Sequence, residues 1–300
     1  MKTYSRIMKR ISAALAATGM LLALAACGQT AATTTAAPEK KTPETTAAPQ
    51  TTAAPAVEGT KAKGDQFVVG FDANFPPYGY LEDGEYKGFD LSLAEEVCKR
   101  RGWELVKRPI DWDAKDMELT SGSIDCIWNG FTINGREGLY AWTPAYVDNS
   151  QVFVVRSDSG IAKQADLAGK VVVVQADSSA LAALEDEENE EAVKLTASFA
   201  KLEQVPDYNT AFMNLESGAV DAVAMDIGVA HYQIDKREAG AYVILEDELV
   251  QEEYGIGFKL DGGEALRDQV WETVLEMMAD GTFAKIADDY GLGEAIKISK

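Results

Sequence analysis

The sequence predicts an α/β protein of two lobes, in which each lobe is a mostly parallel sheet flanked by helices and a ligand cleft lies between the lobes. Strand patterns alternate with helical patterns twice along the chain, and such βαβ series require parallel strands. The roughly 235 residues after position 65 are enough for one large domain or two lobes.

The first βαβ unit begins with a strand at residues 67–71. An amphipathic helix at 90–101 follows, with Asp90 as its candidate N-cap. The remaining elements of this unit are a strand at 104–107, a helix at 113–120 and a strand at 124–128. Ser121-Gly122 ends the second helix.

The second unit repeats this alternation and is followed by two terminal helices. Strands are predicted at 151–155, 171–175, 220–225, 241–245 and 254–258, and helices at 178–186, 207–216, 264–279 and 282–290. Gly255 to Phe258 needs a sheet to join, so the chain is expected to return to the first lobe. Lobe 1 is therefore 66–155 plus 254–300, lobe 2 is 156–253, and the crossings near 154–157 and 248–254 form a hinge.

The first 26 residues are typical of a secretory signal. Four basic residues precede an apolar stretch at 11–26, which is the pattern of a signal peptide. The ending Leu24-Ala25-Ala26-Cys27 resembles the bacterial lipobox, in which the cysteine is lipidated. We therefore expect a lipid anchor at Cys27, with an ordinary signal peptide or an anchor helix as the alternative.

Residues 27–65 contain almost no large apolar side chain and repeat Thr-Thr-Ala-Ala-Pro at 34–38, 45–49 and 51–55. Such a segment cannot bury enough surface to offset its ordering entropy. We expect a disordered tether that spans roughly 35 Å and lifts the folded part off a membrane.

The charge of the chain excludes some partners. The formal net charge is −21, and the first 26 residues hold four basic and no acidic residues, so the rest carries −25. This charge argues against nucleic acid and anionic lipid as partners. No second apolar run long enough to span a bilayer follows the signal.

The segment from Ile124 to Arg136 predicts a carboxylate pocket. A short apolar strand ends in Asn129, Gly130 and Thr132, and an arginine follows closely. The carboxyl ends of strands in open α/β sheets face ligand crevices. A guanidinium at such a point can hold a carboxylate with two parallel hydrogen bonds.

Five segments together resemble one family. They are G-F-D-A-N-F-P-P-Y-G-Y (70–80), Y-K-G-F-D-L-S-L-A (86–94), the segment 124–136, V-V-V-V-Q-A-D-S-S (171–179) and G-A-V-D-A-V-A-M-D (218–226). With A-D-G-T-F-A-K-I (279–286), they resemble the extracytoplasmic solute-binding proteins of polar amino-acid ABC transporters, the group of the histidine- and glutamine-binding proteins. The resemblance implies the type II periplasmic-binding-protein-like fold and covers the chain from Gln66 to its end.

The resemblance also implies a site for a free amino acid. A buried zwitterion needs partners for both its carboxylate and its ammonium, because an unpaired buried charge is costly. Arg136 corresponds to the family's carboxylate-binding arginine and Asp226 to its ammonium-binding aspartate. Further contacts to the carboxylate are expected from Thr132, Asn129, Gly130, Ser178 and Ser179.

The ligand side chain is expected to lie among aromatic residues. Phe75 corresponds to the aromatic that covers it, and Trp112 and Trp128 are candidate walls. Asp72 lies near the side-chain end, where a carboxylate favours a cationic ligand such as arginine, lysine or histidine; the alternative is that Asp72 caps the local turn.

Two departures from the family pattern affect the site. The family writes T-I-T-P-E-R where this chain has Thr132 to Arg136, one residue shorter, so Arg136 is expected to approach from a different helix start. The family's glycine before the hydroxyl pair is Asp177 here, which we expect to point outward.

The other reactive residues predict little chemistry. Cys98 and Cys126 are interpreted as core thiols, with a disulfide between them as the alternative. His231 is interpreted as structural rather than catalytic. The acids at 111, 113 and 116 lack the pattern of a calcium loop, so no metal and no cofactor is expected.

These observations favour a lipid-anchored, monomeric binding protein that delivers a polar amino acid to an ABC permease and performs no covalent chemistry. One alternative is an enzyme on the same fold, a dehydratase acting on cyclohexadienyl acids, which needs a general acid in the cleft. The other is a sensor that works without a transporter.

Overall fold

The computed structural model describes residues 59–297. The predicted signal peptide and Cys27 lie outside the described residues, as does most of the predicted tether. Before β1, the chain is already attached to the folded part: Lys61 N donates to Gln269 Oε1 at 2.9 Å, and Gln269 Nε2 donates to Lys61 O at 3.0 Å. The last residues of the predicted tether are thus ordered against a helix of the terminal segment.

The described strands form one large and one small sheet. The large sheet has the order β10-β9-β11-β8-β13-β6-β1-β5, with β12 beside β8 and β7 beside β13. Its strands are β1 (Gln66–Phe71), β5 (Glu104–Pro109), β6 (Cys126–Thr132), β7 (Tyr140–Trp142), β8 (Val147–Arg156), β9 (Val171–Gln175), β10 (Lys201–Val205), β11 (Ala222–Asp226), β12 (Tyr242–Ile244) and β13 (Val250–Lys259). The small sheet consists of β2 (Asn74–Phe75), β3 (Gly79–Glu82) and β4 (Glu85–Lys87).

Helices cover both faces of the large sheet. They are α1 (Phe89–Arg101), α2 (Lys115–Ser121), α3 (Ser179–Leu184), α4 (Glu190–Ser198), α5 (Tyr208–Ser217), α6 (Ile227–Asp235), α7 (Glu264–Ala279) and α8 (Thr282–Asp289). Short 3-10 turns lie at Trp112–Ala114 and Gln164–Leu167. Between residues 59 and 297, no helix has the length and apolar character that crossing a membrane requires.

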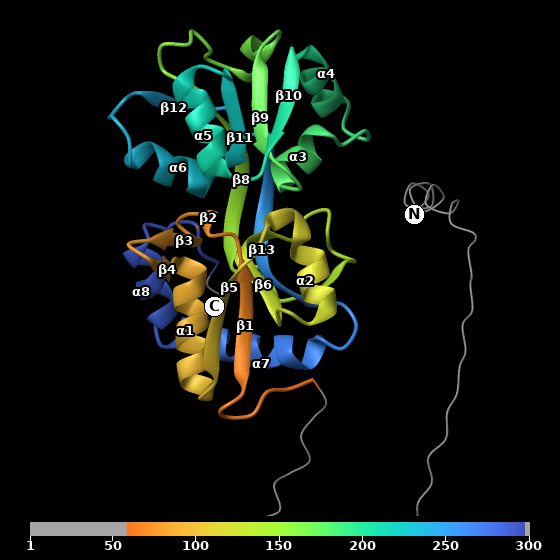
Figure 1. The fold of residues 1–300 in the computed structure, drawn as a ribbon, viewed down its shortest axis with the longest axis vertical. Coiled ribbons are helices and arrows are strands. Elements are labelled where there is room, and N and C mark those ends of the chain that lie inside the picture. Colours follow the sequence, from red (N-terminus) through yellow and green to blue (C-terminus); the bar gives the residue numbers. More distant parts are fainter. Residues whose placement is uncertain (1–58, 298–300) are drawn as a thin grey trace, which may run out of the picture. The chain divides into compact units, whose positions relative to one another are not determined.

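Strands β8 and β13 carry the chain between the two lobes (Figure 1). They pair antiparallel from Gln151↔Val250 to Val147↔Tyr254. The far end of β13 pairs with β6 in the first lobe, as the sequence predicted for this segment, whereas the far end of β8 pairs with β11 and β12 in the second.

The crossing on β8 precedes the predicted hinge segment at 154–157. Residues 152–156 already pair with β11 and β12 in the second lobe. The predicted strand at 151–155 is the second half of the longer strand β8. The lobe division at 155/156 stays a prediction, and the register favours a division several residues earlier.

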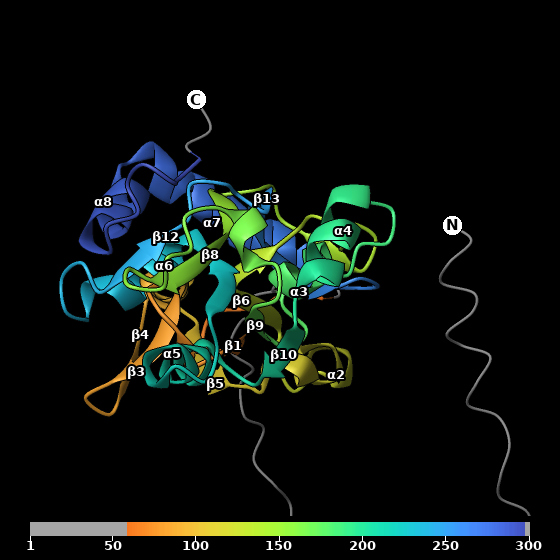
Figure 2. The same ribbon diagram turned by 90° about the horizontal axis from the view of Figure 1, so that it is seen from above.

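The second lobe buries side chains on both faces of its strands. In β9, Val172 and Val174 pack with Leu184 and the rest of α3, while Val173 lies on the opposite face with Phe212 of α5. This is the two-residue period of a strand buried on both sides. Figures 1 and 2 show α3 and α5 on opposite sides of β9.

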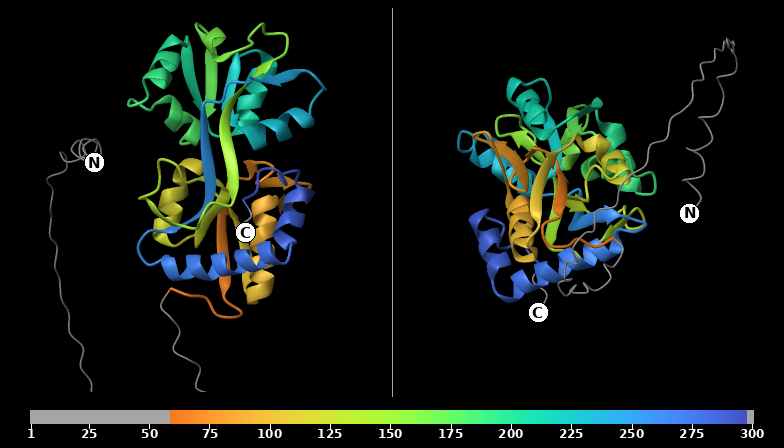
Figure 3. Two further views of the ribbon diagram at one scale, coloured as in Figure 1. Left: turned by 180° about the vertical axis from the view of Figure 1, so that it is seen from behind. Right: turned by 60° about the horizontal axis from the view of Figure 1, so that its bottom comes forward.

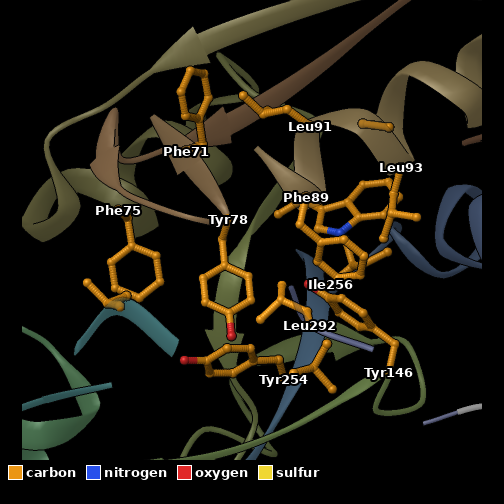
Figure 4. Packing of buried hydrophobic residues seen from close by; sticks show 14 of the residues in the cluster. Phe71, Phe75, Tyr78, Phe89, Leu91, Leu93, Tyr146, Tyr254, Ile256 and Leu292 are labelled. Atoms are coloured by element: carbon orange, nitrogen blue, oxygen red, sulfur yellow. The ribbon is translucent and has the colours of Figure 1, made fainter. Parts of the chain in front are cut away.

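The first lobe is closed by α1, α7 and α8 on one face and α2 on the other. Figure 3 shows α7, in blue, crossing the lobe when it is seen from behind. Aromatic rings fill the core beside α1: Tyr78 lies 5.2 Å from Tyr254 and 6.4 Å from Phe89, measured between ring centroids (Figure 4). These rings extend to the edge of the cleft.

The structure corrects two expectations about local structure and confirms one. Strand β6 runs to Thr132, so Asn129 and Gly130 lie within a buried strand and not beyond its end. Asp90 is not the N-cap of α1; Gly88 is, and the Asp90 carboxylate points into the core. Cys98 and Cys126 are free and buried, which confirms their interpretation as core thiols.

Packing of α3 against the second sheet face predicts a clear stability effect. Leu184 is 1% exposed, so Leu184→Ala should lower the free energy of unfolding by about 2–5 kcal/mol through lost burial and a cavity. Urea denaturation measures this change. The control is Leu275→Ala in α7, at 40% exposure, where we expect about 0.5 kcal/mol or less. Equal effects at both positions would contradict the described packing.

Candidate functional site

A pocket of ≈ 580 Å³ opens between the lobes. The first lobe lines it with residues after β1 and β5, and the second lobe with residues after β9 and β10. Five of the lining residues are acidic and none is basic: Asp72, Asp111, Asp113, Glu118 and Asp207. The pocket therefore favours a positively charged group.

Asp72 is held at the inner end of this pocket and is 5% exposed. Its carboxylate accepts hydrogen bonds from Asn74 N at 2.8 Å and, across the cleft, from Gln175 Nε2 at 2.7 Å. Burial raises the pKa of Asp72 to about 6. The side-chain oxygen of Asn129 accepts a hydrogen bond from the backbone N–H of Asp72 at 2.9 Å. Asn129 therefore positions Asp72 within the first lobe.

Asp226 lies at the end of β11, against the crossing strands β8 and β13 where the two lobes meet. We call this place the floor of the cleft; it is not part of the lining of the acidic pocket. The Asp226 carboxylate accepts hydrogen bonds from Asn149 Nδ2 at 2.9 Å, from Gln151 Nε2 at 2.7 Å and from the hydroxyl of Tyr254. Burial, and then the nearby charge of Glu252, raise the pKa of Asp226 to about 7. A buried carboxylate in this state gains most from a positively charged partner.

Glu252 on β13 is a second buried carboxylate on the same floor and is 5% exposed. Thr132 Oγ1 of the first lobe donates to its Oε1 at 2.9 Å, and Ser179 Oγ of the second lobe donates to it at 3.2 Å. Glu252 thus connects the two hydroxyls that were expected to bind a ligand carboxylate. The hydroxyl of Ser178 has a different partner, because it caps α3 by accepting Leu181 N at 3.1 Å.

Arg136 lies in the turn between β6 and β7. Its guanidinium donates to the carbonyl oxygens of Thr132 at 3.4 Å and of Asp177 at 3.3 Å. Both hydrogen bonds are long, and no carboxylate of residues 59–297 forms an ion pair with this guanidinium. The expected helix start before Arg136 is wrong: a turn at 134–135 replaces it, because the segment is too short to begin a helix.

Asp177 is exposed, as expected of a side chain that points outward, but it is not free. Its carboxylate forms an ion pair across the cleft with Lys115 of α2, whose side chain is 2% exposed. Burial lowers the pKa of Lys115, and the hydrogen bond to Asp177 opposes that shift. Lys115 also lies over the ring of Trp112, 5.2 Å from its centroid. This ion pair joins the two lobes at the rim of the cleft.

Two of the predicted aromatic residues lie where the lobes meet, and their contact with a ligand stays a prediction. Phe75 lies 5.9 Å from Tyr208 of the second lobe, between ring centroids, and half-buried Trp112 lines the pocket. Gly130 is required beside Phe75, because a Cβ there would come within 2.8 Å of its ring. Trp128 is fully buried in the core of the first lobe and lines no described pocket, so it is left out of the site.

Several residues of the site were missed by the sequence reasoning. Glu252, Asn149 and Gln151 lie on the two crossing strands, and Lys115 begins α2. The paired polar residues at Asn149 and Gln151 alternate with the period of a strand, which was the available signal. His231 is exposed on α6, and no group of three or more metal-ligating side chains is found among the residues the structure describes.

Comparisons with known proteins show which family the chain resembles. The sequence signature of the bacterial extracellular solute-binding proteins, family 3, matches residues 67–293. The L-cystine-binding protein TcyJ of Escherichia coli is 26% identical over 74% of this chain and 81% of its own. The arginine-binding extracellular protein ArtP of Bacillus subtilis is 25% identical over 79% of this chain and 90% of its own.

Solved structures show the same fold. An ABC uptake transporter substrate-binding protein from Streptococcus pneumoniae with bound histidine is 32% identical, with a TM-score of 0.72 over 77% of this chain and 95% of its own. The arginine-, lysine-, histidine-binding protein ArtJ from Geobacillus stearothermophilus is 28% identical, with a TM-score of 0.66 over 75% of this chain and 95% of its own.

The buried carboxyls predict an unusual pH dependence for the empty protein. Burial raises the pKa of Asp72 to about 6 and those of Asp90 and Asp226 to about 7. Between the ordinary carboxyl pKa of the unfolded chain and these raised values, the folded state binds more protons than the unfolded state. The free energy of unfolding is therefore greatest near the unfolded pKa and falls as the pH rises through the folded pKa values. The urea midpoint should therefore be higher at about pH 5 than at about pH 8. An equal or higher midpoint at the alkaline pH would contradict the description of these carboxyls.

Proposed function

Because the chain belongs to the bacterial extracellular solute-binding proteins of family 3 and is the substrate-binding component of an amino-acid ABC importer, we propose that it closes its two lobes around one cationic amino acid. The observation that carries this proposal is the acidic pocket between the lobes, which holds buried Asp72 at its inner end. Buried charges need a partner of opposite sign.

The α-carboxylate and the α-ammonium of the ligand would have separate partners. Arg136 has only long hydrogen bonds to carbonyl oxygens, so its guanidinium is available to a carboxylate. The hydroxyls of Thr132 and Ser179, which donate to Glu252 in the empty protein, would turn to the same carboxylate. Asp226 offers a negative charge to the ammonium. These groups come from both lobes, so a ligand that engages all of them favours the closed state over the open one.

The side chain of the ligand would extend toward Asp72 and the acidic pocket. Phe75 and Trp112 provide apolar surface for its aliphatic or ring portion, and Asp72 receives its charge. Among the related proteins, ArtP is named for arginine and one structure holds histidine, while TcyJ is named for L-cystine. Cystine brings a second carboxylate as well as a second ammonium, and five acidic side chains disfavour that carboxylate.

The other parts of the proposal concern the location of the protein and its mode of action. We place it outside the cytoplasm, attached to the membrane through lipid on Cys27, and acting as a monomer without covalent chemistry. Buried carboxyls with a raised pKa can serve as general acids, so prephenate turnover is the assay that separates the binding protein from a dehydratase.

The ion-pairing residues of the site predict a large loss of affinity on truncation. Arg136→Ala and Asp226→Ala should each weaken amino-acid binding by roughly 2–5 kcal/mol, because each leaves a buried ligand charge unpaired. Isothermal titration calorimetry measures the loss. Arg108→Ala is the control, since Arg108 contacts the backbone of Ser123 away from the cleft. Wild-type affinity in either site variant would refute the assignment of that residue.

Asp72 predicts selectivity for charge. The wild type should bind L-arginine more tightly than L-citrulline, which has nearly the same shape but no side-chain charge. Asp72→Asn should remove about 1.5–3 kcal/mol of that preference, the value of a hydrogen bond to a charged group. Competition binding with both ligands measures it. A preference that survives the substitution unchanged would show that Asp72 only caps its turn.

The lipid anchor predicts a change of location. Cys27→Ala should release the protein from the membrane fraction into the soluble extracytoplasmic fraction, because the sulfur of Cys27 is the atom that would receive the lipid. Fractionation followed by detection of the folded part measures this. Retention of the variant in the membrane would indicate an uncleaved anchor helix.

A further inference from the structure

Two buried carboxylates on the floor of the cleft share the same hydrogen-bond donors. Asn149 Nδ2 lies 2.9 Å from Asp226 Oδ1 and 2.6 Å from Glu252 Oε1. Gln151 Nε2 lies 2.7 Å from Asp226 Oδ1 and 2.6 Å from Glu252 Oε1. Both carboxylates are almost fully buried, so two negative charges would face each other with little screening by water.

No positive side chain compensates this pair. Among residues 59–297, no lysine or arginine forms an ion pair with Asp226 or Glu252; the basic groups of the cleft, Arg136 and Lys115, both engage Asp177. A carboxylate beside a second negative charge takes up a proton more readily unless a cation is present, and Asp226 is the member of the pair whose pKa is raised, by burial and then by the charge of Glu252.

The amide side chains supply a second, independent observation. With their nitrogens facing the carboxylates, Asn149 Oδ1 and Gln151 Oε1 are buried and have no hydrogen-bond partner. An unpaired buried acceptor costs about 1–3 kcal/mol. The floor of the cleft therefore holds unpaired acceptors and excess negative charge at once, and both deficits are met by a group that has several donors and a positive charge.

We propose that Glu252 and Asp226 together form a two-carboxylate seat for the α-ammonium of the ligand, and that Asp226 holds a proton there when the cleft is empty. This inference rests on the proposed function and extends it, because it makes Glu252 a specificity-determining residue. An ammonium has three donors and no acceptor, so it can engage both carboxylates and an amide oxygen. Binding would then release a proton near neutral pH.

The surroundings leave Asp226 as the local titrating group. The tyrosines that face it are Tyr78 from the loop after β2, Tyr208 from α5 and Tyr254 from β13, and burial raises the pKa of each well above 10. The other carboxyl nearby is Asp90 of α1, which is held by Gly130 N at 2.6 Å and by the hydroxyl of Tyr146 at 2.8 Å. Asp90 is present in the wild type and in both variants below, so its effect on the melting temperature is the same in all three proteins.

The first experiment uses the ligand-free protein. Wild type, Glu252→Gln and Glu253→Gln are melted at about pH 5 and about pH 8. Glu253 is the matched control, because it is the next residue and pairs with Lys297 instead. Glu252→Gln removes the repulsion with ionised Asp226, so its melting temperature relative to wild type should be higher at the alkaline pH than at the acidic pH by about 2–4 °C. Glu253→Gln should show no such pH-dependent gain. Absence of the gain in Glu252→Gln overturns the carboxylate pair.

The second experiment tests the occupied state with L-arginine. Calorimetry in phosphate and in Tris at neutral pH should show that the wild type releases protons on binding, whereas Glu252→Gln releases fewer and binds about tenfold more weakly or worse. Binding without proton release, or equal affinity in the variant, overturns the ammonium seat. If the wild type binds no amino acid at all, the proposed function falls, while the melting experiment still decides whether the two carboxylates repel each other in the empty protein.

Discussion

The cleft contains buried carboxylates that need a positive charge, and the protein itself does not supply one. The rest of the site depends on this constraint. Asp72, Asp226 and Glu252 are all buried, and no lysine or arginine of the described chain pairs with them. A buried carboxylate without a cation is destabilising and takes up a proton more readily than an exposed one. The proposed ligand, with one positive group at its α-carbon and one at its side-chain end, would supply the missing charge.

The crossing strands place these groups where both lobes meet. In the register of β8 against β11, Gln151 lies opposite Asp226, and in the register of β8 against β13, Asn149 lies opposite Glu252. A shift of one residue would turn every one of these side chains to the other face. The floor of the cleft is therefore formed by strands that both lobes share, whereas each wall belongs to a single lobe. Contacts such as Lys115 with Asp177 and Gln175 with Asp72 then join the walls when the lobes close.

Much of the fold was predictable because its local signals are strong. Strand β9 and helix α7 occur at their predicted bounds, since one is a run of valines before Gln175 and the other a helical pattern that starts after Gly263. Strand β6 was predicted too short, because Asn129 resembles a loop residue although it is buried and bonded to Asp72. Tertiary contacts decided that boundary, and local propensity could not.

The site was predictable only where family resemblance or charge marked it. Arg136, Asp226, Phe75 and Asp72 were proposed in that way. Glu252 was not, because a glutamate within Glu246 to Glu253 resembles an exposed charged segment, and only the strand pairing turns it inward. Trp128 was predicted to be a wall of the ligand site, but it is fully buried in the core of the first lobe.

A thermal-shift screen of the twenty amino acids, with ornithine and cystine added, tests the central claim most directly, because a ligand that binds only the folded form raises the melting temperature. If the buried carboxylates of the cleft require positive charge, arginine, lysine, ornithine or histidine should give the largest shift. A largest shift from glutamate, or from an apolar amino acid, would contradict this account.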